Sequence, residues 1–336
     1  MVVAEPVLVV DDLVVDFPTG DGVVHAVRGL SLSVREGQVL GIVGESGSGK
    51  SVTALAVMGL LPPGTRVSGS VRYRGRELLG LPDRELRAVR GRRVAMVFQD
   101  ATTALNPVYR VGWQVAEAVR AHQDVSAREA WRRAVELLDM VGIPDAPDRA
   151  RSYPHQYSGG MCQRAVIAMA MAHDPDVILA DEPTAALDVT VQAQILATMR
   201  EAQRRTSAAI VLITHDLGVV AGMADEVLVM YAGRAVEVGP VDEVYERPRM
   251  PYTRNLLASR PGVERDGSCL APVPGPPVVR RDPPAGCPFA PRCGLAEERC
   301  AESEPALEPA DGRVHRAACH RAGEPMDLTV PAADGG

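Results

Sequence analysis

The chain has 336 residues, of which 46% are hydrophobic and only 4% are aromatic. It is long enough to bury a substantial core, and it suits one large domain with an appendage or two domains. The formal net charge of -7 at pH 7 argues against a dedicated nucleic-acid-binding protein, which usually carries a basic surplus.

Residues 1–17 lack the basic segment and the apolar stretch of a signal peptide. Nowhere in the chain do about 18 apolar residues follow one another, so we expect no helix that crosses a membrane by itself. Six cysteines in a chain of this size do not indicate a disulfide scaffold. These features predict a cytoplasmic protein.

The first part of the chain is rich in β-branched residues. Residues 7–17 and 23–34 are separated by the turn sequence PTGDG, which predicts two strands. Residues 38–43, QVLGIV, form a short apolar run that is typical of a buried parallel strand. A glycine-rich loop follows, and then a helical spacing of apolar residues over 51–61.

The middle of the chain changes from a strand pattern to a helical pattern and back. Residues 92–99 predict another buried strand, and a helical subdomain is expected over about 100–170. Its helices are predicted at 113–122, 127–142 and 159–173. Short buried strands then return at 176–181, 208–214 and 225–230. The repeated order of strand, loop and helix predicts an α/β fold with a mostly parallel sheet.

The C-terminal part of the chain differs in composition from the rest. Residues 261–286 include a Pro-rich run and predict a linker after a first domain at 1–260. Four of the six cysteines fall in a short extension at 287–320. We expect residues 321–336 to form a mobile tail.

Residues 44–51, GESGSGKS, contain the only lysine in the chain, although Lys and Arg together number 36. The spacing G-x-x-x-x-G-K-[ST] predicts a loop whose backbone N–H groups cradle phosphate oxygens at a helix N-terminus. An ammonium is a compact charge, whereas a guanidinium is a wide planar fork. Lys50 therefore indicates a position between two phosphates, and Ser51 supplies a hydroxyl to Mg²⁺. The nucleotide-binding residues predicted in and beside this loop are Gly44, Glu45, Ser46, Gly47, Ser48, Gly49, Lys50, Ser51 and Val52.

Four further stretches accompany the loop. They are FQD at 98–100, YSGGMCQR at 157–164, VILADEPTAALD at 177–188 and LITHD at 212–216. With the glycine loop, they occur in the order and approximate spacing of the ATP-binding-cassette (ABC) ATPases, and residues 5–260 strongly resemble that family. The resemblance implies a P-loop NTPase fold with an N-terminal antiparallel β subdomain and a helical signature subdomain.

The resemblance also implies roles for single residues. Asp181 would hold the hydration shell of Mg²⁺, and Glu182 would polarise the attacking water. His215 resembles a residue that contacts the γ-phosphate of ATP. Gln99 resembles one that touches both Mg²⁺ and the water. Phe17 either stacks on adenine or packs as a core aromatic.

Ser158, Gly159 and Gly160 belong to the family signature, which contacts the γ-phosphate bound to the opposite subunit. Asp188 would lie at the same seam, so the resemblance implies a protein that works as half of a dimer. The signature departs from the commonest wording, L-S-G-G-Q, because Tyr157 and Met161 flank S-G-G here.

Longer stretches are similar to one branch of the family, the ATPase subunits of dipeptide, oligopeptide and nickel importers. They are GIVGESGSGKS, FQDATTALNPVYRVGWQ, YPHQYSGGMCQR, RPRMPYTRNLLASRP and GCPFAPRC. This similarity extends to about residue 320 and implies a peripheral motor on the cytoplasmic face of the cell membrane.

The implied partners are two transmembrane permeases, a second ATPase that is identical or different, and an extracytoplasmic solute-binding protein. No nucleic-acid partner is expected. The sequence does not choose among dipeptides, longer peptides, nickel chelates and glutathione. The alternative function is a non-transport ABC ATPase with a metal-sensing or iron–sulfur tail.

The extension contains Cys287, Cys293, Cys300 and Cys319. Four thiolates can hold a [4Fe–4S] cluster, and some peptide-importer ATPases carry one in this region. Zinc is the alternative, with His315 and His320 nearby. A third interpretation leaves the cysteines unligated.

Overall fold

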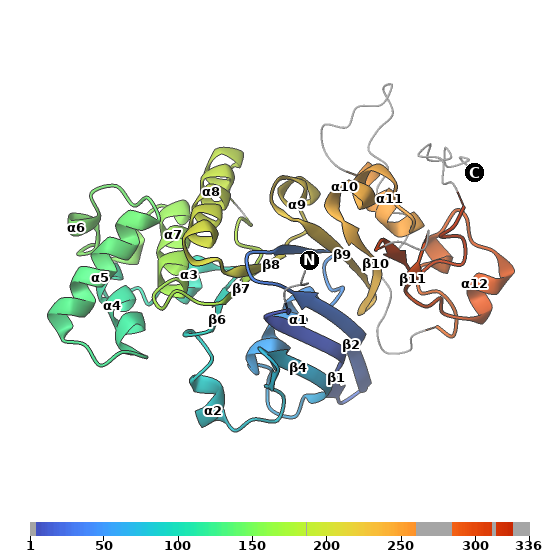
Figure 1. The fold of residues 1–336 in the computed structure, drawn as a ribbon, viewed down its shortest axis with the longest axis horizontal. Coiled ribbons are helices and arrows are strands. Elements are labelled where there is room, and N and C mark those ends of the chain that lie inside the picture. The colour runs from blue at the N-terminus through green and yellow to red at the C-terminus, as the bar shows by residue number, and fades with distance from the viewer. Residues whose placement is uncertain (1–4, 186, 260–283, 311–313, 325–336) are drawn as a thin grey trace.

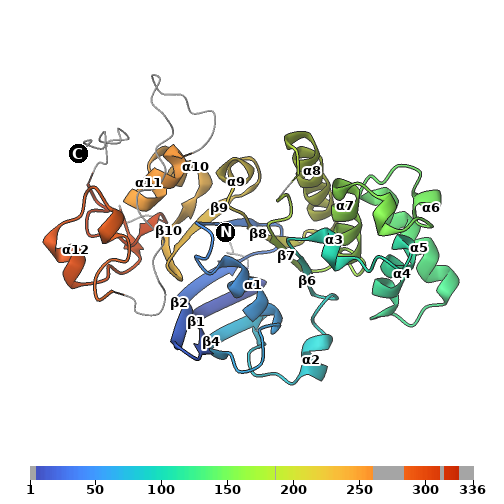
Figure 2. The ribbon, with the colours of Figure 1, turned by 180° about the vertical axis from the view of Figure 1, so that it is seen from behind.

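The computed structural model describes residues 5–185, 187–259, 284–310 and 314–324. A helical region lies at one end of the molecule and the C-terminal extension at the opposite end, with two sheets between them (Figure 1). The view from behind shows the same arrangement (Figure 2). Most of the linker predicted over 261–286, and of the tail predicted over 321–336, lies outside the described residues.

The N-terminal sheet is antiparallel. Its strands are β1 (Leu8–Thr19), β2 (Gly22–Val34), β4 (Arg66–Tyr73) and β5 (Arg76–Glu77), in the spatial order β2-β1-β4-β5. β1 and β2 form the hairpin that the sequence predicts, with Thr19 opposite Gly22 at the turn. β4 was not predicted, because half of its residues are exposed and Gly69 interrupts the alternation of Val67, Val71 and Tyr73 with polar residues.

The central sheet is mostly parallel. Its parallel strands are β3 (Val39–Val43), β6 (Val94–Val97), β7 (Val177–Asp181), β8 (Ala209–Ile213) and β9 (Glu226–Tyr231). Antiparallel strands complete it at one edge, namely β10 (Arg234–Pro240), β11 (Glu308–Pro309) and β12 (Arg316–Ala317). In the described chain the spatial order is β11-β12-β10-β9-β3-β8-β7-β6. This arrangement confirms the predicted α/β class.

The parallel strands of the central sheet are buried on both faces. Every residue of β3, β7 and β8 is buried, and the buried hydrophobic residues of the described chain form two clusters. Along β3, Val39 and Val43 join the cluster that contains the helical region, whereas Leu40 and Ile42 join the cluster under the N-terminal sheet. Successive side chains of a strand point to opposite faces, so one apolar run serves both clusters.

The helices of the described residues are α1 (Lys50–Met58), α2 (Asp83–Arg87), α3 (Ala101–Ala104), α4 (Val111–Arg120), α5 (Ala127–Met140), α6 (Ala146–Arg149), α7 (Gly159–Ala170), α8 (Val189–Thr206), α9 (Leu217–Met223), α10 (Val241–Glu246), α11 (Pro251–Ala258) and α12 (Glu298–Glu302). The helices predicted over 51–61, 113–122, 127–142 and 159–173 correspond to α1, α4, α5 and α7, with ends that differ by up to three residues, and no bounds were predicted for the others. Short 3₁₀ turns occur at Pro154–Gln156 and Ala290–Arg292. α3 to α7 gather at one end of the molecule, where a helical subdomain is expected (Figure 1).

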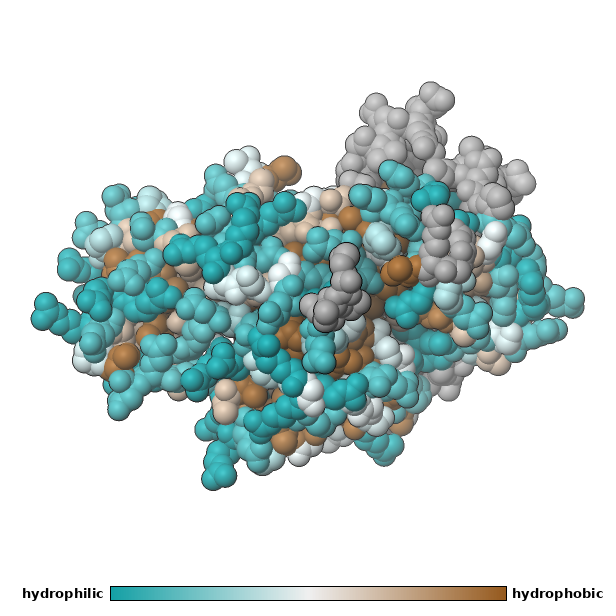
Figure 3. Space-filling model, in the orientation of Figure 1, coloured by the Kyte–Doolittle hydropathy of each residue, from teal (hydrophilic) through white to brown (hydrophobic). Residues whose placement is uncertain are grey.

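The face of the molecule seen in Figure 3 is mostly hydrophilic, and hydrophobic residues reach its surface in small patches. Within the described ranges, no helix combines the length and the apolar composition that crossing a membrane requires.

Candidate nucleotide site and cysteine pocket

The predicted phosphate loop joins the carboxyl end of β3 to the amino end of α1. Gly44 has φ of +154° and Gly49 has φ of +109°, a backbone conformation that side-chain-bearing residues rarely adopt. A Cβ atom on Gly44 would lie 2.2 Å from the Met230 carbonyl oxygen, and one on Gly49 would lie 2.6 Å from that of Ala26. The close approach of neighbouring backbone therefore requires glycine at both positions.

Lys50 is the first residue of α1 and is only 5% exposed. Its ammonium group donates hydrogen bonds to the carbonyl oxygens of Gly44, at 2.8 Å, and Glu45, at 3.0 Å. The positive charge thus lies across the loop and beside a helix N-terminus, and both features favour anions such as phosphate.

Ser51 and Asp181 come together from different elements, α1 and the end of β7. The Ser51 hydroxyl donates to Asp181 Oδ1 over 2.9 Å. Burial raises the pKa of Asp181, and the charge of Glu182 acts in the same direction, while the Ser51 hydrogen bond and Lys50 oppose them. A hydroxyl and a carboxylate next to a phosphate loop are oxygen ligands of the kind that Mg²⁺ prefers. These two side chains therefore fit the predicted magnesium site.

Glu182 lies within reach of both other predicted catalytic residues. Its Oε2 atom is 3.1 Å from Nδ1 of His215 and 3.5 Å from Nε2 of Gln99. Glu182 has φ of +46°, although it is not glycine, and its N–H donates to the Ile213 carbonyl over 2.8 Å. Left-handed non-glycine residues often occur at functional sites, where the surrounding structure holds them in place. The structure thus gathers these three side chains at the ends of adjacent strands.

The signature residues have local roles in this single chain. Ser158 caps α7 by accepting a hydrogen bond from Met161 N–H, and Asp188 caps α8 by accepting one from Val191 N–H. α7 and α1 lie in different parts of the molecule (Figures 1 and 2). The proposed contact of Ser158, Gly159, Gly160 and Asp188 with a nucleotide on a partner subunit stays a prediction.

Phe17 lies in β1, opposite Val24, and is half-buried against the cluster under the N-terminal sheet. This position agrees with a packing role, and the adenine-stacking role stays a prediction.

Two residues that contact the loop were not predicted from the sequence. The Arg292 guanidinium makes two hydrogen bonds to the Glu45 carboxylate, and the Tyr252 hydroxyl accepts one from Glu45 N–H. These residues are distant in sequence and no motif spacing connects them. A carboxylate inside an anion-binding loop was the available signal, because such a charge needs a cation beside it.

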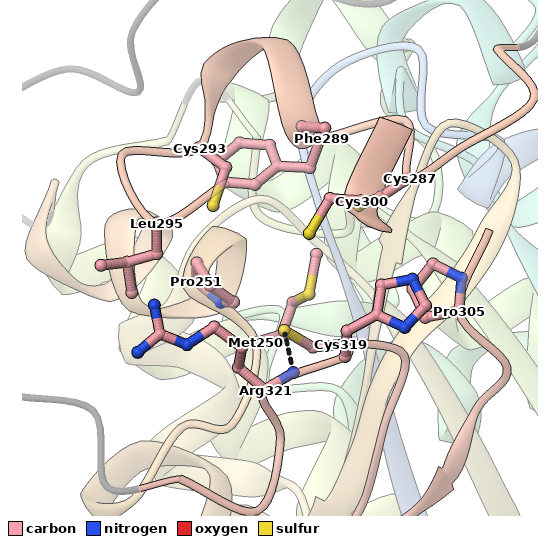
Figure 4. A pocket seen from close by; sticks show the side chains of 12 residues that line it. Met250, Pro251, Cys287, Phe289, Cys293, Leu295, Cys300, Pro305, Cys319 and Arg321 are labelled. Atoms are coloured by element: carbon pink, nitrogen blue, oxygen red, sulfur yellow. Dashed lines mark hydrogen bonds between the residues drawn. The ribbon is translucent and has the colours of Figure 1, made fainter. Parts of the chain in front are cut away.

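The four cysteines of the extension come together. Cys287, Cys293, Cys300 and Cys319 line one pocket with Met250 (Figure 4). Burial raises the pKa of Cys287 and Cys293, and it raises that of Cys319 to about 11. In the part of the chain that the structure describes, no three His, Cys, Asp or Glu side chains form a group that could hold a metal ion.

The two histidines of the zinc alternative lie in different surroundings. His320 lines the cysteine pocket. His315 instead pairs with Glu237, with 2.7 Å between Nε2 and Oε1, and both side chains are buried. The structure therefore uses His315 for packing the extension against β10.

Comparisons with known proteins agree with this geometry. Residues 27–185 match the family described as ABC transporter. Residues 236–300 match the family described as oligopeptide/dipeptide transporter, C-terminal region.

Similar proteins are named as ATP-binding proteins of oligopeptide or dipeptide transport. The oligopeptide transport ATP-binding protein OppD of Mycobacterium tuberculosis is 53% identical over 318 residues, which are 94% of this chain and 52% of that protein. OppD of Escherichia coli is 49% identical over 311 residues, which are 93% of this chain and 92% of that protein. The dipeptide transport ATP-binding protein DppD of Bacillus subtilis is 49% identical over 291 residues, which are 86% and 87%. The chain thus spans about half the length of the mycobacterial relative and most of the other two.

Solved structures of cassettes share the fold. The dimeric ATP-binding cassette MJ0796, in a post-hydrolysis state bound to ADP and Pi, has a TM-score of 0.63 and 27% identity, and the match covers 70% of this chain and 98% of that one. CbiO1 of Clostridium perfringens has a TM-score of 0.61 and 27% identity, over 72% and 91% of the two chains. This chain therefore belongs to the ABC ATPases, in the family of ATP-binding proteins of oligopeptide and dipeptide transporters.

Proposed function

We propose that this chain is the ATP-hydrolysing subunit of a peptide importer and works at the cytoplasmic face of the cell membrane. The observation that carries the proposal is the hydrogen bond between Ser51 and Asp181, because it joins the phosphate loop to the strand that presents Glu182. The names of the relatives support peptides as the transported class.

The phosphates of ATP would lie on the loop, where Lys50 and the amino end of α1 favour negative charge. Ser51 and Asp181 would hold Mg²⁺, which neutralises phosphate charge when it is bound. Glu182 would accept a proton from the attacking water, while Gln99 and His215 hold the carboxylate in place. Phosphoryl transfer depends mainly on positioning and charge neutralisation, and these side chains supply both.

Two ATPase subunits, identical or different, would face each other so that Ser158 to Gly160 and Asp188 complete the partner's nucleotide site. The dimeric state of the MJ0796 structure supports this assembly. Two transmembrane permeases and an extracytoplasmic solute-binding protein would complete the importer. The relatives reported above are transport proteins, so they give no support to a non-transport role.

The test is to isolate the chain with its bound partners and to measure ATP hydrolysis in the assembled transporter. Two polytopic membrane proteins should co-purify. Glu182→Gln should lower hydrolysis about 100-fold or more and keep MgATP binding, because an amide does not accept the proton of the water. The control is Glu201→Gln, which changes an exposed glutamate of α8 and should hydrolyse ATP like the parent. Normal turnover in Glu182→Gln would remove this residue from its role, and isolation without permeases would contradict the importer.

We further propose that the four cysteines of the pocket hold one [4Fe–4S] cluster, with zinc as the alternative metal. Convergence of four thiols from a short segment supports this, although their side chains would have to turn toward one another to become ligands. Ligation would then order the extension, because metal binding contributes folding free energy directly.

This second proposal is tested by anaerobic purification followed by iron, sulfide and zinc analysis of the parent and of Cys293→Ser. About four iron atoms and four acid-labile sulfides per chain, lost in the variant, would support the cluster. One zinc per chain would favour the alternative. A parent chain without metal under these conditions would contradict both.

A further inference from the structure

We propose that Arg292 of the C-terminal extension is a positioning residue of the nucleotide site, because it neutralises Glu45 and fixes the phosphate loop. The inference rests on the proposed function, since it assumes that this loop binds the phosphates of ATP. It makes the extension a working part of the nucleotide site.

The negative charge of Glu45 is unfavourable at its position in the loop unless a cation neutralises it. Glu45 is the second residue of a loop that favours anions, and an unpaired carboxylate there would repel phosphate. Arg292 neutralises this carboxylate through two parallel hydrogen bonds, Nη1 to Oε2 at 2.8 Å and Nη2 to Oε1 at 2.9 Å. The arginine side chain is 6% exposed and that of Glu45 is 23% exposed. A bidentate pair of this kind fixes geometry as well as charge.

Arg292 is itself held by aromatic residues. Its Nη1 donates to the Tyr231 hydroxyl over 3.1 Å, and its guanidinium lies 5.8 Å from the Tyr231 ring and 5.9 Å from the Phe289 ring. The rings of Tyr231, Tyr252 and Phe289 pack on one another, with centroids 4.5 to 5.4 Å apart. The guanidinium is therefore oriented before any nucleotide binds.

The backbone of Glu45 connects the aromatic residues to Lys50 of the loop. Its N–H donates to the Tyr252 hydroxyl over 2.8 Å, and its carbonyl accepts from the Lys50 ammonium over 3.0 Å. A shift of Glu45 would therefore move an acceptor of the lysine that meets the phosphates. Arg292 acts on the site through Glu45 and does not need to touch the nucleotide.

The short segment that contains Arg292 also lies between two cysteines of the pocket. Ala290–Arg292 forms a 3₁₀ turn between Cys287 and Cys293. Ala290 N–H donates to the Cys287 carbonyl, and Cys293 N–H donates to the Ala290 carbonyl. The position of Arg292 thus depends on how these two cysteines are held, which links the pocket to the phosphate loop.

The test measures MgATP affinity of the purified full-length chain by calorimetry, with thermal unfolding as a check of folding. Arg292→Ala should weaken MgATP binding about tenfold or more, because it leaves a carboxylate unneutralised beside the phosphates. Arg292→Lys should lie between, since it restores charge without the fork. Arg292→Ala combined with Glu45→Gln should recover most of the affinity, because the repelling charge is gone. A purely structural role for Arg292 does not predict this recovery.

The matched control is Glu304→Gln. Glu304 also joins the extension to the rest of the chain, because it forms a bidentate pair with Arg28 and an ion pair with Arg234. Neither of these contacts involves Glu45. This variant should bind MgATP within about twofold of the parent. Equal losses in Glu304→Gln and Arg292→Ala would overturn the proposal, as would parent-like affinity in Arg292→Ala or no recovery in the double variant.

If Arg292→Ala does not fold, Arg292→Lys with and without Glu45→Gln carries the same test. A parent chain that binds no MgATP would contradict the proposed function itself. Failure of this inference is distinguishable from failure of the proposed function, because every outcome that overturns the inference requires a parent chain that binds MgATP.

Discussion

At the scale of single residues, the phosphate loop selects side chains by shape as well as by charge. Lys50 is buried at the start of α1, and its hydrogen-bond partners include two backbone carbonyl oxygens. An ammonium on a thin stem can approach both oxygens, whereas a planar guanidinium needs more room and a different donor geometry.

Lys50→Arg should therefore lower ATP hydrolysis about 100-fold, although the charge is kept. Hydrolysis by the assembled transporter is the measurement. The control is the reverse exchange at an exposed position, Arg132→Lys in α5, which should leave hydrolysis unchanged. Equal rates in Lys50→Arg and the parent would show that shape does not matter here.

Asp181 should make the nucleotide-free chain less stable at neutral pH. Burial raises its pKa above the ordinary value of 3.8, so the folded chain binds this proton more tightly than the unfolded chain. Between the two pKa values the folded chain holds more protons, and the free energy of unfolding falls as the pH rises. Below 3.8 both states are protonated and this penalty disappears.

Asp181→Asn should accordingly raise the melting temperature of the nucleotide-free chain by a few degrees at pH 7, and the gain should shrink as the pH falls toward 4. The same variant should lose the stabilisation that MgATP gives the parent. Thermal unfolding with and without MgATP, at several pH values, measures both effects. An equal gain at every pH would mean that the charge of Asp181 is not its cause.

The proximity of the three proposed catalytic residues was predictable because each lies in a short motif at the end of a strand, and the structure brings His215 and Gln99 within 3.1 and 3.5 Å of Glu182. Arg292 was not predictable in this way. Its partner Glu45 is 247 residues away in the chain, and no local pattern encodes a contact over that separation.

At the scale of secondary-structure elements, close contact between α7 and α8 depends on a missing side chain. Gly160 is in the first turn of α7, and a Cβ atom there would lie 2.4 Å from Val191 Cγ1 in α8. Replacing glycine by alanine usually favours a helix by about 1 kcal/mol, but overpacking costs about 1–3 kcal/mol. We expect the steric cost to exceed the gain.

Gly160→Ala should therefore lower the free energy of unfolding, and adding Val191→Ala should restore part of it by making space. Gly222→Ala in α9 is the control, because a Cβ atom there meets nothing within 4 Å and should leave the chain equally or more stable. Urea unfolding of the four chains measures the differences. A stable single variant at position 160 would show that α8 moves aside at little cost.

Strands were easier to predict from the sequence where all their residues are buried. β3, β7 and β8 were visible in the sequence because every residue is buried and apolar runs result. The strand predicted over 92–99 is shorter, Val94–Val97, because Arg92, Arg93 and Phe98 are exposed at its ends. β4 was not predicted, because half of its residues are exposed and Gly69 leaves a gap in its short alternation of apolar and polar residues.

At the scale of the whole molecule, buried polar contacts attach the extension to the rest of the chain. Glu237 in β10 is fully buried and accepts hydrogen bonds from His315 and from the backbone N–H groups of Arg249 and Met250. The family resemblance predicted that an extension is present. It did not predict these contacts, because they depend on how distant segments pack.

His315→Ala should lower the free energy of unfolding by about 2 kcal/mol, because it leaves a buried carboxylate with one hydrogen bond fewer. His320→Ala is the control, since that half-buried imidazole makes only a solvent-exposed contact, to the Ser303 carbonyl, and its loss should cost less. Urea unfolding checks both. Equal effects of the two variants would contradict a special role for the buried pair.

β12 has a consequence for any attempt to shorten the chain. It pairs with β10, Glu237 opposite Ala317 and Val238 opposite Arg316, and so covers the last strand of the main body of the central sheet. Without it, β10 would present a row of unsatisfied backbone groups beside buried side chains such as Val236 and Val238. Bare strand edges of this kind pair with those of other molecules. A cassette cut at the linker should therefore aggregate on expression, whatever its nucleotide site can still do.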